Sequence, residues 1–357
     1  MGRVVADPQG PRRKGTRVTR SHAWLLAVVA WTLGGIGGPA AHADPPVVTL
    51  KLGTIAPQES PYLEGCLLAA KLAAKNSKGA VEVRVLPSGM LGDESQMIDS
   101  LRRGTLDMFA GSGIAAHGII PELAALELPF LFHDGREVDT VIERLWPLLS
   151  KTVAQRGYRL IAHTTVGFRH LGSAGPLRTM ADLRAVRMRA QPSPLHTRFW
   201  ELAGVHATPI GQLQVADALA AKTVTGFDSA LTWVFAAGWH LHIKEITQSQ
   251  HMYQPGVILM TEKAWQRIPA PLRAGLFEGH EVLSRANIQR IRSVEKELFS
   301  ALPGMGVHVS EMPKELVDEF VKATMPLEAE WRAKASPAGR RLLDAIKKEL
   351  TRLRAQG

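Results

Sequence analysis

Short stretches of alternating apolar and polar residues, each followed by a helical stretch, most strongly constrain the fold of this chain. The first three predicted strands lie at residues 47–52, 81–86 and 106–110, with helices between them at residues 61–75 and 94–103. Ser60 and Pro61 begin the first helix, because serine caps a helix and proline fits its first turn. Strands that alternate with helices predict an α/β fold with a largely parallel sheet.

The same alternation resumes in the second half of the chain. Further strands are predicted at residues 159–165, 186–190, 207–210, 223–228, 243–252, 257–259 and 307–309, and helices at residues 138–155, 193–203, 215–222, 271–302, 314–325 and 338–355. The helix expected over residues 271–302 is unbroken by proline, and its length suits a segment that crosses between two lobes. The chain is long enough for two cores of ordinary domain size.

The N-terminal segment, residues 1–43, has the order of a secretory signal peptide. A basic region precedes an apolar run at residues 22–33, and an Ala-x-Ala cleavage site ends at Ala43. The apolar run is shorter than the ~20 residues that a membrane-spanning helix needs. We therefore expect export to the periplasm with cleavage after Ala43. Arg12 and Arg13 leave both the general secretory and the twin-arginine route open.

Charge and cysteine content narrow the class of protein. The net charge of +10 falls by half when residues 1–43, with six basic residues and one acidic residue, are removed. The remaining excess is dispersed, unlike the dense basic patches of nucleic-acid-binding proteins. The single cysteine, Cys66, cannot form an intrachain disulfide and is expected to be a small buried apolar residue.

Three short motifs suggest specific chemistry, but each fits a simpler structural role better. Residues 111–116 spell G-x-G-x-x-A, yet Pro121 shortens any helix there, so a tight turn close to a ligand fits better than a dinucleotide site. His240 and His242 lack a third metal ligand at a fixed spacing. Asp93 is well placed to cap the helix that follows it. We therefore expect neither a cofactor nor a metal.

Two arginines, Arg169 and Arg189, are placed at the ends of predicted strands. Open α/β sheets bind ligands beside strand ends, and the arginine fork matches both oxygens of a carboxylate. Either arginine alone would fit a surface ion pair as well. Together they predict a receptor for a small organic anion.

With these residues in view, the chain resembles the periplasmic solute receptors of tripartite ATP-independent periplasmic (TRAP) transporters, of the dicarboxylate-receptor (DctP) type. The resemblance extends from about residue 50 to about residue 331, almost the whole exported chain. It rests on the order and spacing of short matching stretches at residues 50–53, 86–89, 91–94, 104–108, 121–122, 128–132, 167–169, 182–183, 188–189, 208–210, 218–219 and 269–272.

The resemblance implies two α/β lobes around a ligand cleft, joined by crossing strands and the long helix. It places lobe I at residues 44–166 and 251–296, lobe II at residues 167–250 and 297–335, and a C-terminal helical extension at residues 336–357. It implies that Arg189 is the principal carboxylate-binding arginine and Arg169 the second. It also places Gln212, Ser112 and Glu94 at positions that reach the ligand.

The chain departs from the family pattern over residues 225–230. Ser229 replaces a common asparagine, and Asp228 is expected to put a carboxylate near the pocket, where it would repel the second carboxylate of a dianion. Phe227 and Trp233 are expected to add aromatic area. The ligand is therefore expected to be less acidic, larger or more apolar than a C4-dicarboxylate, such as an aromatic, keto- or hydroxy-monocarboxylate.

The predicted function is non-enzymatic. The exported chain would capture a small organic anion, close around it and deliver it to the integral-membrane subunits of a TRAP permease. Two alternatives stay open at this point: an exported α/β enzyme that uses the same cleft, and a receptor that feeds a sensor. A nucleophile beside a base in the cleft would favour the enzyme. No nucleic-acid partner and no membrane insertion of the exported chain are expected.

Overall fold

The computed structural model describes residues 47–356, in which ten strands join in one sheet. The strands are β1 (Val48–Gly53), β2 (Val81–Leu86), β3 (Met108–Ser112), β4 (Tyr158–Ser173), β5 (Met188–Ala190), β6 (Ala207–Pro209), β7 (Gly226–Ala230), β8 (Glu245–Gln248), β9 (Tyr253–Thr261) and β10 (His308–Glu311). Their order is β2-β1-β3-β9-β4-β7-β5-β6, and β8 pairs with both β4 and β10. Each predicted strand overlaps one of these ten.

Helices lie between most of these strands, as predicted, although none lies between β8 and β9. They are α1 (Pro61–Asn76), α2 (Glu94–Arg103), α3 (Gly113–Ala116), α4 (Gly135–Ala154), α5 (Met180–Ala185), α6 (Pro194–Leu202), α7 (Val215–Ala220), α8 (Leu231–Ala236), α9 (Glu262–Arg267), α10 (Ala270–Arg273), α11 (His280–Ala301), α12 (Lys314–Thr324), α13 (Pro326–Lys334) and α14 (Pro337–Arg354), with 3₁₀ helices η1 (Pro121–Leu126), η2 (Gln212–Gln214), η3 (Trp239–His242) and η4 (Leu302–Met305). The predicted caps are confirmed: the Ser60 hydroxyl accepts the Leu63 N–H at 3.2 Å, and Asp93 caps α2.

The sheet is mixed rather than largely parallel. Within each half the strands pair in parallel, β1 with β2 and β3, and β5 with β6 and β7. By contrast, β4 and β9 run antiparallel to each other and to their neighbours β7 and β3. The prediction of a largely parallel sheet was wrong for these two strands, because the alternation of side chains along a strand does not encode its direction.

The strand β4 links the two halves of the sheet and is 16 residues long. Its first part pairs with β9, whereas residues 169–173 pair with β7. The register shifts just before Gly167, which has a φ of +128°. A Cβ atom there would lie 2.9 Å from the Cβ of Ala230, so the bend requires glycine. Because β4 continues past the bend, Arg169 lies inside a strand, and its predicted place at a strand end was wrong.

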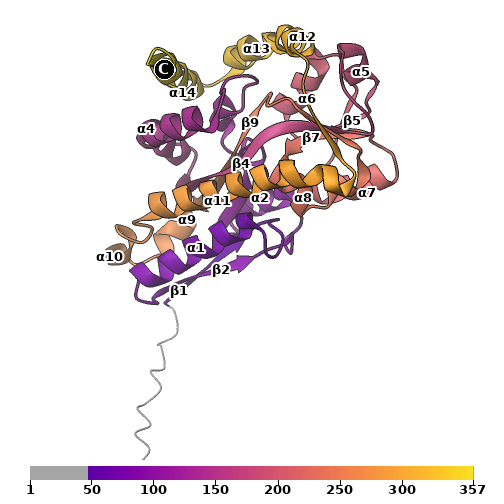
Figure 1. The fold of residues 1–357 in the computed structure, drawn as a ribbon. Helices are drawn as coiled ribbons and strands as arrows, with labels where there is room; N and C mark the ends of the chain where they lie inside the picture. Colours follow the sequence, from indigo (N-terminus) through magenta and orange to yellow (C-terminus); the bar gives the residue numbers. More distant parts are fainter. Residues whose placement is uncertain (1–46, 357) are drawn as a thin grey trace, which may run out of the picture. The chain divides into compact units, whose positions relative to one another are not determined.

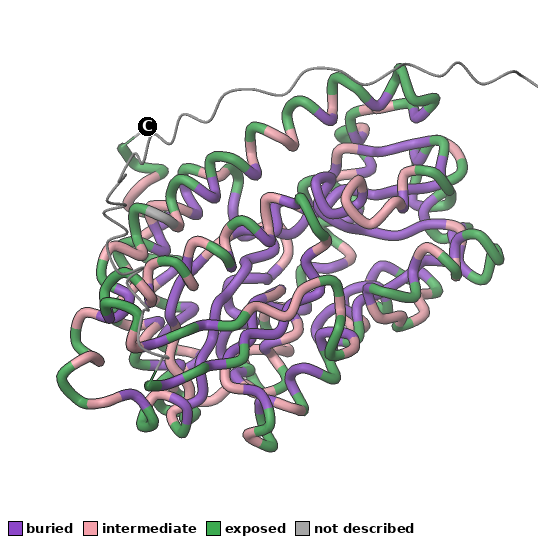
Figure 2. The backbone as a smooth tube through the Cα atoms, turned by 90° about the horizontal axis from the view of Figure 1, so that it is seen from below, coloured by how far each residue is buried: buried purple, intermediate pink, exposed green. Residues whose placement is uncertain are grey.

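Buried residues lie mostly in the interior of the chain trace, and exposed residues lie mostly along its outside (Figure 2). A smaller apolar core lies between α1 and strands β1, β3 and β9, and it includes Leu50, Cys66 and Met260. The larger core continues from α2 and α4 into the second half of the sheet. The burial of Cys66 confirms the expectation of a small apolar core residue.

The helix predicted over residues 271–302 is divided into α10 and α11. Gly279, with a φ of +87°, lies directly before α11, and such left-handed glycines interrupt helices. The 22-residue helix α11 contacts α1, β4 and α8, and Figure 1 shows it running beside α1. It therefore touches both halves of the sheet, as the long predicted helix was expected to do.

The C-terminal helices α13 and α14 pack against different helices of the fold. The helix α13 contacts α6, where Arg198 pairs with Glu330 at 2.8 Å, and α14 contacts α4, where Arg354 pairs with Glu137 at 2.7 Å.

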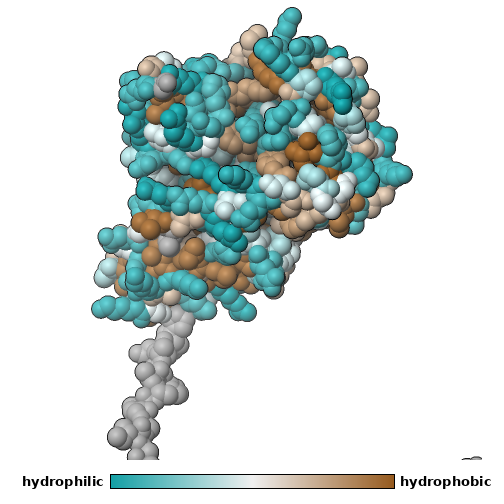
Figure 3. Space-filling model, in the orientation of Figure 1, coloured by the Kyte–Doolittle hydropathy of each residue, from teal (hydrophilic) through white to brown (hydrophobic). Residues whose placement is uncertain are grey.

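On the face drawn in Figure 3, hydrophilic side chains cover much of the surface. The assignment of residues to two lobes and an extension stays a prediction.

Within residues 47–356, none of the helices combines the length and the apolar character that crossing a membrane requires. The predicted signal peptide falls on residues 1–43, outside the residues that the structure describes.

Candidate ligand-binding site

Arg189 is fully buried in β5, and part of its guanidinium group is unused. Its Nε donates to the carbonyl oxygen of Ile210 at 2.8 Å, and its Nη2 donates to Oε1 of Gln212 at 3.3 Å. Its Nη1 is buried and has no hydrogen-bond partner among the described residues. A buried charged donor without a hydrogen-bond partner is energetically unfavourable. A ligand whose acceptor atom bonds to Nη1 would remove this cost, which favours its binding.

The acidic groups near Arg189 do not fully compensate its burial and the positive charge of Arg169. Burial lowers the pKa of Arg189 to about 9, and the positive charge of Arg169 adds to that effect. The acidic groups of Asp228, Asp93 and Glu94 oppose the shift without cancelling it. An anion beside the guanidinium group would favour its charged form and would itself be stabilised.

Two cavities meet at a wall in front of Arg189. The inner cavity has a volume of about 70 Å³ and lies between α1, α11 and strands β3, β4 and β9. The outer cavity has a volume of about 290 Å³ and lies between α2, α3 and the start of α6. Glu94 and Gln212 line both cavities. Because Gln212 is also bonded to Arg189, the guanidinium group lies one side chain behind the shared wall.

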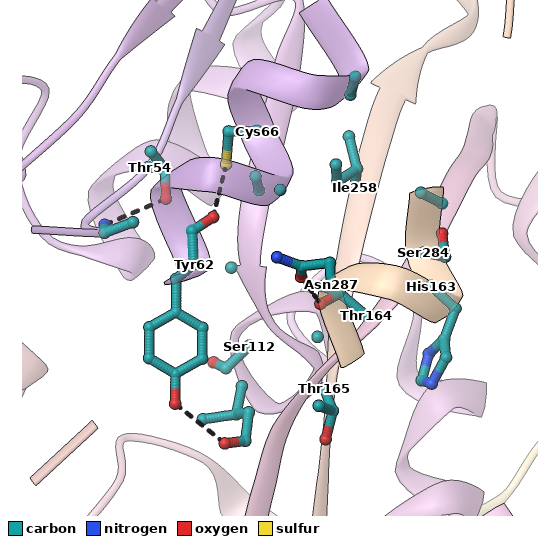
Figure 4. Close-up of a pocket in the computed structure, with 18 of the residues that line it drawn as sticks. Thr54, Tyr62, Cys66, Ser112, His163, Thr164, Thr165, Ile258, Ser284 and Asn287 are labelled. Atoms are coloured by element: carbon teal, nitrogen blue, oxygen red, sulfur yellow. Dashed lines mark hydrogen bonds between the residues drawn. The ribbon is translucent and has the colours of Figure 1, made fainter. Parts of the chain in front are cut away.

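The inner cavity brings together several predicted ligand residues. Glu94, Ser112, Gln212 and Trp233 all line it. Figure 4 shows Tyr62 and Ser112 toward one side of this cavity, and Ser284 of α11 toward the other. Gly111, next to Ser112 at the end of β3, also lines this cavity, and the helix α3 that follows is only four residues long, as the early proline suggested.

Glu94 contributes a carboxyl group to the shared wall. Ser112 donates its backbone N–H and its hydroxyl to the two carboxyl oxygens, each at 2.7 Å. Burial raises the pKa of Glu94 to about 7 in spite of these hydrogen bonds, and Arg189 opposes the increase. Glu94 is therefore partly protonated near neutral pH, and its protonation state changes the charge that faces Arg189.

Arg169 and Asp228 form a fully buried ion pair near Arg189. Arg169 Nε donates to Asp228 Oδ2 at 2.5 Å, and Nη2 donates to the backbone oxygen of Asp228 at 2.5 Å. Its Nη1 donates to the side-chain oxygens of Gln191 at 2.7 Å and Gln254 at 2.6 Å. Because most of its donors are used inside the protein, this geometry favours a positioning role for Arg169 over direct contact with a ligand.

Two histidines also contact the Oδ2 atom of Asp228. The Nε2 atoms of His196 and His251 lie 2.9 and 3.1 Å from Asp228 Oδ2. His196 Nδ1 accepts the backbone N–H of Gln191 at 2.8 Å, which places the ring hydrogen on Nε2. Burial lowers the pKa of His196 to about 4, so this ring is neutral at neutral pH. Burial alone would raise the pKa of Asp228, but the Arg169 charge and the histidine hydrogen bonds hold it well below its usual value.

Three predicted ligand residues on β7 have other surroundings. Asp228 already pairs with Arg169, so its expected repulsion of a second ligand carboxylate loses its basis. The buried Phe227 ring packs edge-to-face on Trp239 with centroids 5.1 Å apart. Ser229 is buried opposite His170 of β4. The structure therefore places Phe227 and Ser229 in the core of the sheet instead of the wall formed by Gln212.

Sequence reasoning missed the partners of the buried ion pair. Gln191 could have been predicted, because it follows Arg189 by two residues and the alternation along a strand places both side chains on the same face. By contrast, no spacing connects His196, His251 and Gln254 with Asp228. Asn287 was missed for the same reason: it reaches from α11 across to α1, where its amide donates to the carbonyl of Pro61 at 2.7 Å.

The sequence model of the bacterial extracellular solute-binding protein family 7 (DctP) matches residues 52–334 of this chain. The chain belongs to this family, which confirms the resemblance drawn from the short motifs.

Individual relatives agree with this assignment. A solute-binding protein of Verminephrobacter eiseniae is 24% identical over 268 residues, which are 73% of this chain and 78% of the relative. A TRAP periplasmic solute-binding protein from Polaromonas sp. JS666, solved with D-erythronate, matches with a TM-score of 0.77 and 23% identity, over 84% of this chain and 98% of that one. Another from Desulfovibrio salexigens, with bound orotic acid, has a TM-score of 0.80 and 20% identity, over 85% and 99%. These structures confirm the two-lobed α/β fold.

Proposed function

We propose that this chain is the periplasmic receptor of a TRAP transporter, which captures a small organic acid at Arg189 and passes it to an integral-membrane permease. The observation that carries the proposal is the buried Arg189 guanidinium group, whose Nη1 lacks a partner among residues 47–356. A carboxylate supplies the missing charge and matches the fork of donors. The family assignment supports binding rather than catalysis, and the erythronate- and orotate-bound receptors support a carboxylate ligand.

Gln212 and Glu94 are the side chains proposed to meet the ligand beside Arg189. Gln212 Oε1 now accepts from Nη2, so a carboxylate that binds both Nη atoms would take the place of this amide. The displaced amide and the Glu94 carboxyl group would then remain within reach of the ligand's other polar atoms. Ser112 would act through Glu94, to which it donates two hydrogen bonds.

A thermal-shift screen of the purified exported protein against organic acids tests this proposal. A ligand at a hundred times its dissociation constant stabilises the folded state by about 2.7 kcal/mol, which is readily measured. Sugar acids, keto acids, hydroxy acids and aromatic acids should be included, with uncharged analogues of each as controls. Stabilisation by uncharged analogues alone, or by none of the acids, would contradict the proposal.

Binding is expected to weaken as pH rises through about 7, because Glu94 then gains a negative charge beside the ligand. Its pKa is raised to about 7 by burial, so a protonated Glu94 predominates below that pH. Calorimetric titrations of the acid identified in the screen, at pH 6 and pH 8.5, should show tighter binding at the lower pH. Glu94→Gln should bind with little pH dependence over that range.

The matched control is Glu82→Gln, since Glu82 is exposed on β2. Glu94 also affects stability: its folded pKa lies above its unfolded value, so its contribution is present at low pH and is lost as pH rises through about 7. Glu94→Gln should therefore melt at a higher temperature than the wild type at pH 8 and not at pH 4. A pH profile of binding that is identical in Glu94→Gln and the wild type would assign the titration to another group.

The exported protein is expected to begin at Asp44. The basic, apolar and Ala-x-Ala order of residues 1–43 is the reason, since signal peptidases cut after small residues in this arrangement. Intact-mass measurement of the protein from a periplasmic fraction checks it. A membrane-bound form that keeps Met1 would overturn both the cleavage site and the periplasmic location.

A further inference from the structure

The inner cavity extends well beyond the wall near Arg189. From Gln212 and Ser112 it continues past Tyr62 and along β4 to the space between α1, β9 and α11 (Figure 4). Side chains and small residues of largely apolar character line this inner arm, among them Cys66, Ala69, Ile161, Ile258 and Phe277. The cavity therefore has a polar end and an apolar arm.

Most polar groups along the arm already bond to one another. The Tyr62 hydroxyl donates to the carbonyl of Val166 at 3.0 Å, and the Cys66 thiol donates to the carbonyl of Tyr62 at 3.4 Å. The Thr164 hydroxyl donates to Asn287 Oδ1 at 2.9 Å. A ligand hydroxyl entering this arm would give up its bonds to water with few partners to replace them, which opposes its binding.

The arm also holds little charge. Burial lowers the pKa of His163 to about 4 and raises the pKa of Cys66 to about 12, so both side chains are neutral at pH 7. Two polar atoms that line the inner cavity, Trp233 Nε1 and His280 Nε2, are buried without a hydrogen-bond partner in the described part of the chain. Trp233 belongs to the polar end and His280 to the far end, so the stretch between them favours apolar groups.

We propose that the ligand is an amphipathic monocarboxylate, with its carboxylate at Arg189 and a slim apolar tail in the inner arm beside Ala69 and Ile258. This deepens the proposed function and rests on it, because Arg189 must hold the head group. The cavity volume of about 70 Å³ limits the tail. A water molecule needs roughly 10–15 Å³ by the same measure, so the whole cavity holds about five to seven groups of that size.

The far end of the arm is bounded by a thin partition. His163, His280 and Ser284 line the arm on one side and a third cavity of about 400 Å³, between α4 and α11, on the other. Tails that reach these three residues would meet the partition. Affinity should therefore rise with tail length and then stop rising.

Straight-chain carboxylates from propanoate to decanoate test the proposal by calorimetric titration. Each methylene group buried in the arm should tighten binding by about fourfold until the tail reaches the partition. D-gluconate, a six-carbon acid with hydroxyl groups along its chain, should bind more weakly than hexanoate. A flat affinity across the series, or tighter binding of gluconate than of hexanoate, would overturn the proposal.

Ala69→Leu should fill the arm and abolish the gain with chain length, while propanoate binding stays as in the wild type. Ala70→Leu is the matched control, because it makes the same change at the next position of α1, outside the residues that line the cavity. Propanoate binding by Ala69→Leu also shows that this variant is folded. Equal chain-length dependence in both variants would refute the tail site. If no carboxylate binds at all, or if Arg189→Lys binds propanoate normally, the proposed function itself fails.

Discussion

Replacing Asp228 with asparagine is expected to lower the free energy of unfolding by about 3–5 kcal/mol, because it leaves the Arg169 guanidinium group buried without its counter-charge. Both side chains are fully buried, and Oδ2 of Asp228 accepts from Arg169, His196 and His251 at once. Asparagine keeps the shape but removes the charge. Urea unfolding of the ligand-free protein, followed by tryptophan fluorescence, measures the loss.

The control for this prediction is Asp344→Asn. Asp344 pairs with Arg332 on the surface, where its side chain is 58% exposed, and such pairs contribute at most about 1 kcal/mol. If both variants lose the same stability, the buried pair has no special role. A double variant that replaces Arg169 and Asp228 together should lose less than the two single variants combined, because no unpaired charge is left.

The same ion pair predicts a dependence on acid. The folded pKa of Asp228 lies well below its usual value, so the stability it contributes is present above pH ~4 and is lost as pH falls through the folded pKa. The difference in stability between the wild type and Asp228→Asn should be constant above pH ~5 and should shrink below pH ~4. A constant difference down to pH 2 would mean that Asp228 is not the group that titrates.

The arrangement of elements could be predicted from sequence because it follows from local periodicity. The alternation at residues 81–86 predicted both ends of β2 correctly. Ser60 and Asp93 correctly predicted where α1 and α2 begin. Strand direction and the length of β4 could not be predicted. They depend on pairing with β9 and β7, which lie about ninety and sixty residues further along the chain.

The site was predictable only where one residue carries the chemistry. Arg189 stands out because a guanidinium group inside an apolar strand needs an anion. The roles of Arg169 and Asp228 could not be predicted, since each looks like a ligand group until the other is seen beside it. Their pairing comes from the antiparallel register of β4 on β7, in which Leu171 lies opposite Asp228 and Arg169 opposite Ala230. No spacing within either segment contains that information.

Arg189→Lys is expected to weaken binding of the organic acid at least tenfold. A charged hydrogen bond to a buried group contributes about 1.5–3 kcal/mol, and each 1.4 kcal/mol is a factor of ten in affinity. Lysine keeps the positive charge but offers a single ammonium group, which cannot bond to Ile210 and to both carboxylate oxygens in the plane that the guanidinium group provides. The loss should appear mainly as faster dissociation. Calorimetric titration and stopped-flow fluorescence measure the two quantities.

The matched control is Arg187→Lys, two residues earlier in the chain. The Arg187 guanidinium group is exposed and donates to the backbone oxygens of Lys222 and Thr223, so this change should leave the affinity within about twofold of the wild type. The ligand-free Arg189→Lys protein should still unfold cooperatively, because the ion pair of Arg169 and Asp228 and both apolar cores remain intact. Wild-type affinity in Arg189→Lys would show that the ligand carboxylate lies elsewhere. Loss of binding together with loss of cooperative unfolding would instead make Arg189 a structural residue, and only loss of binding alone supports the role proposed for it.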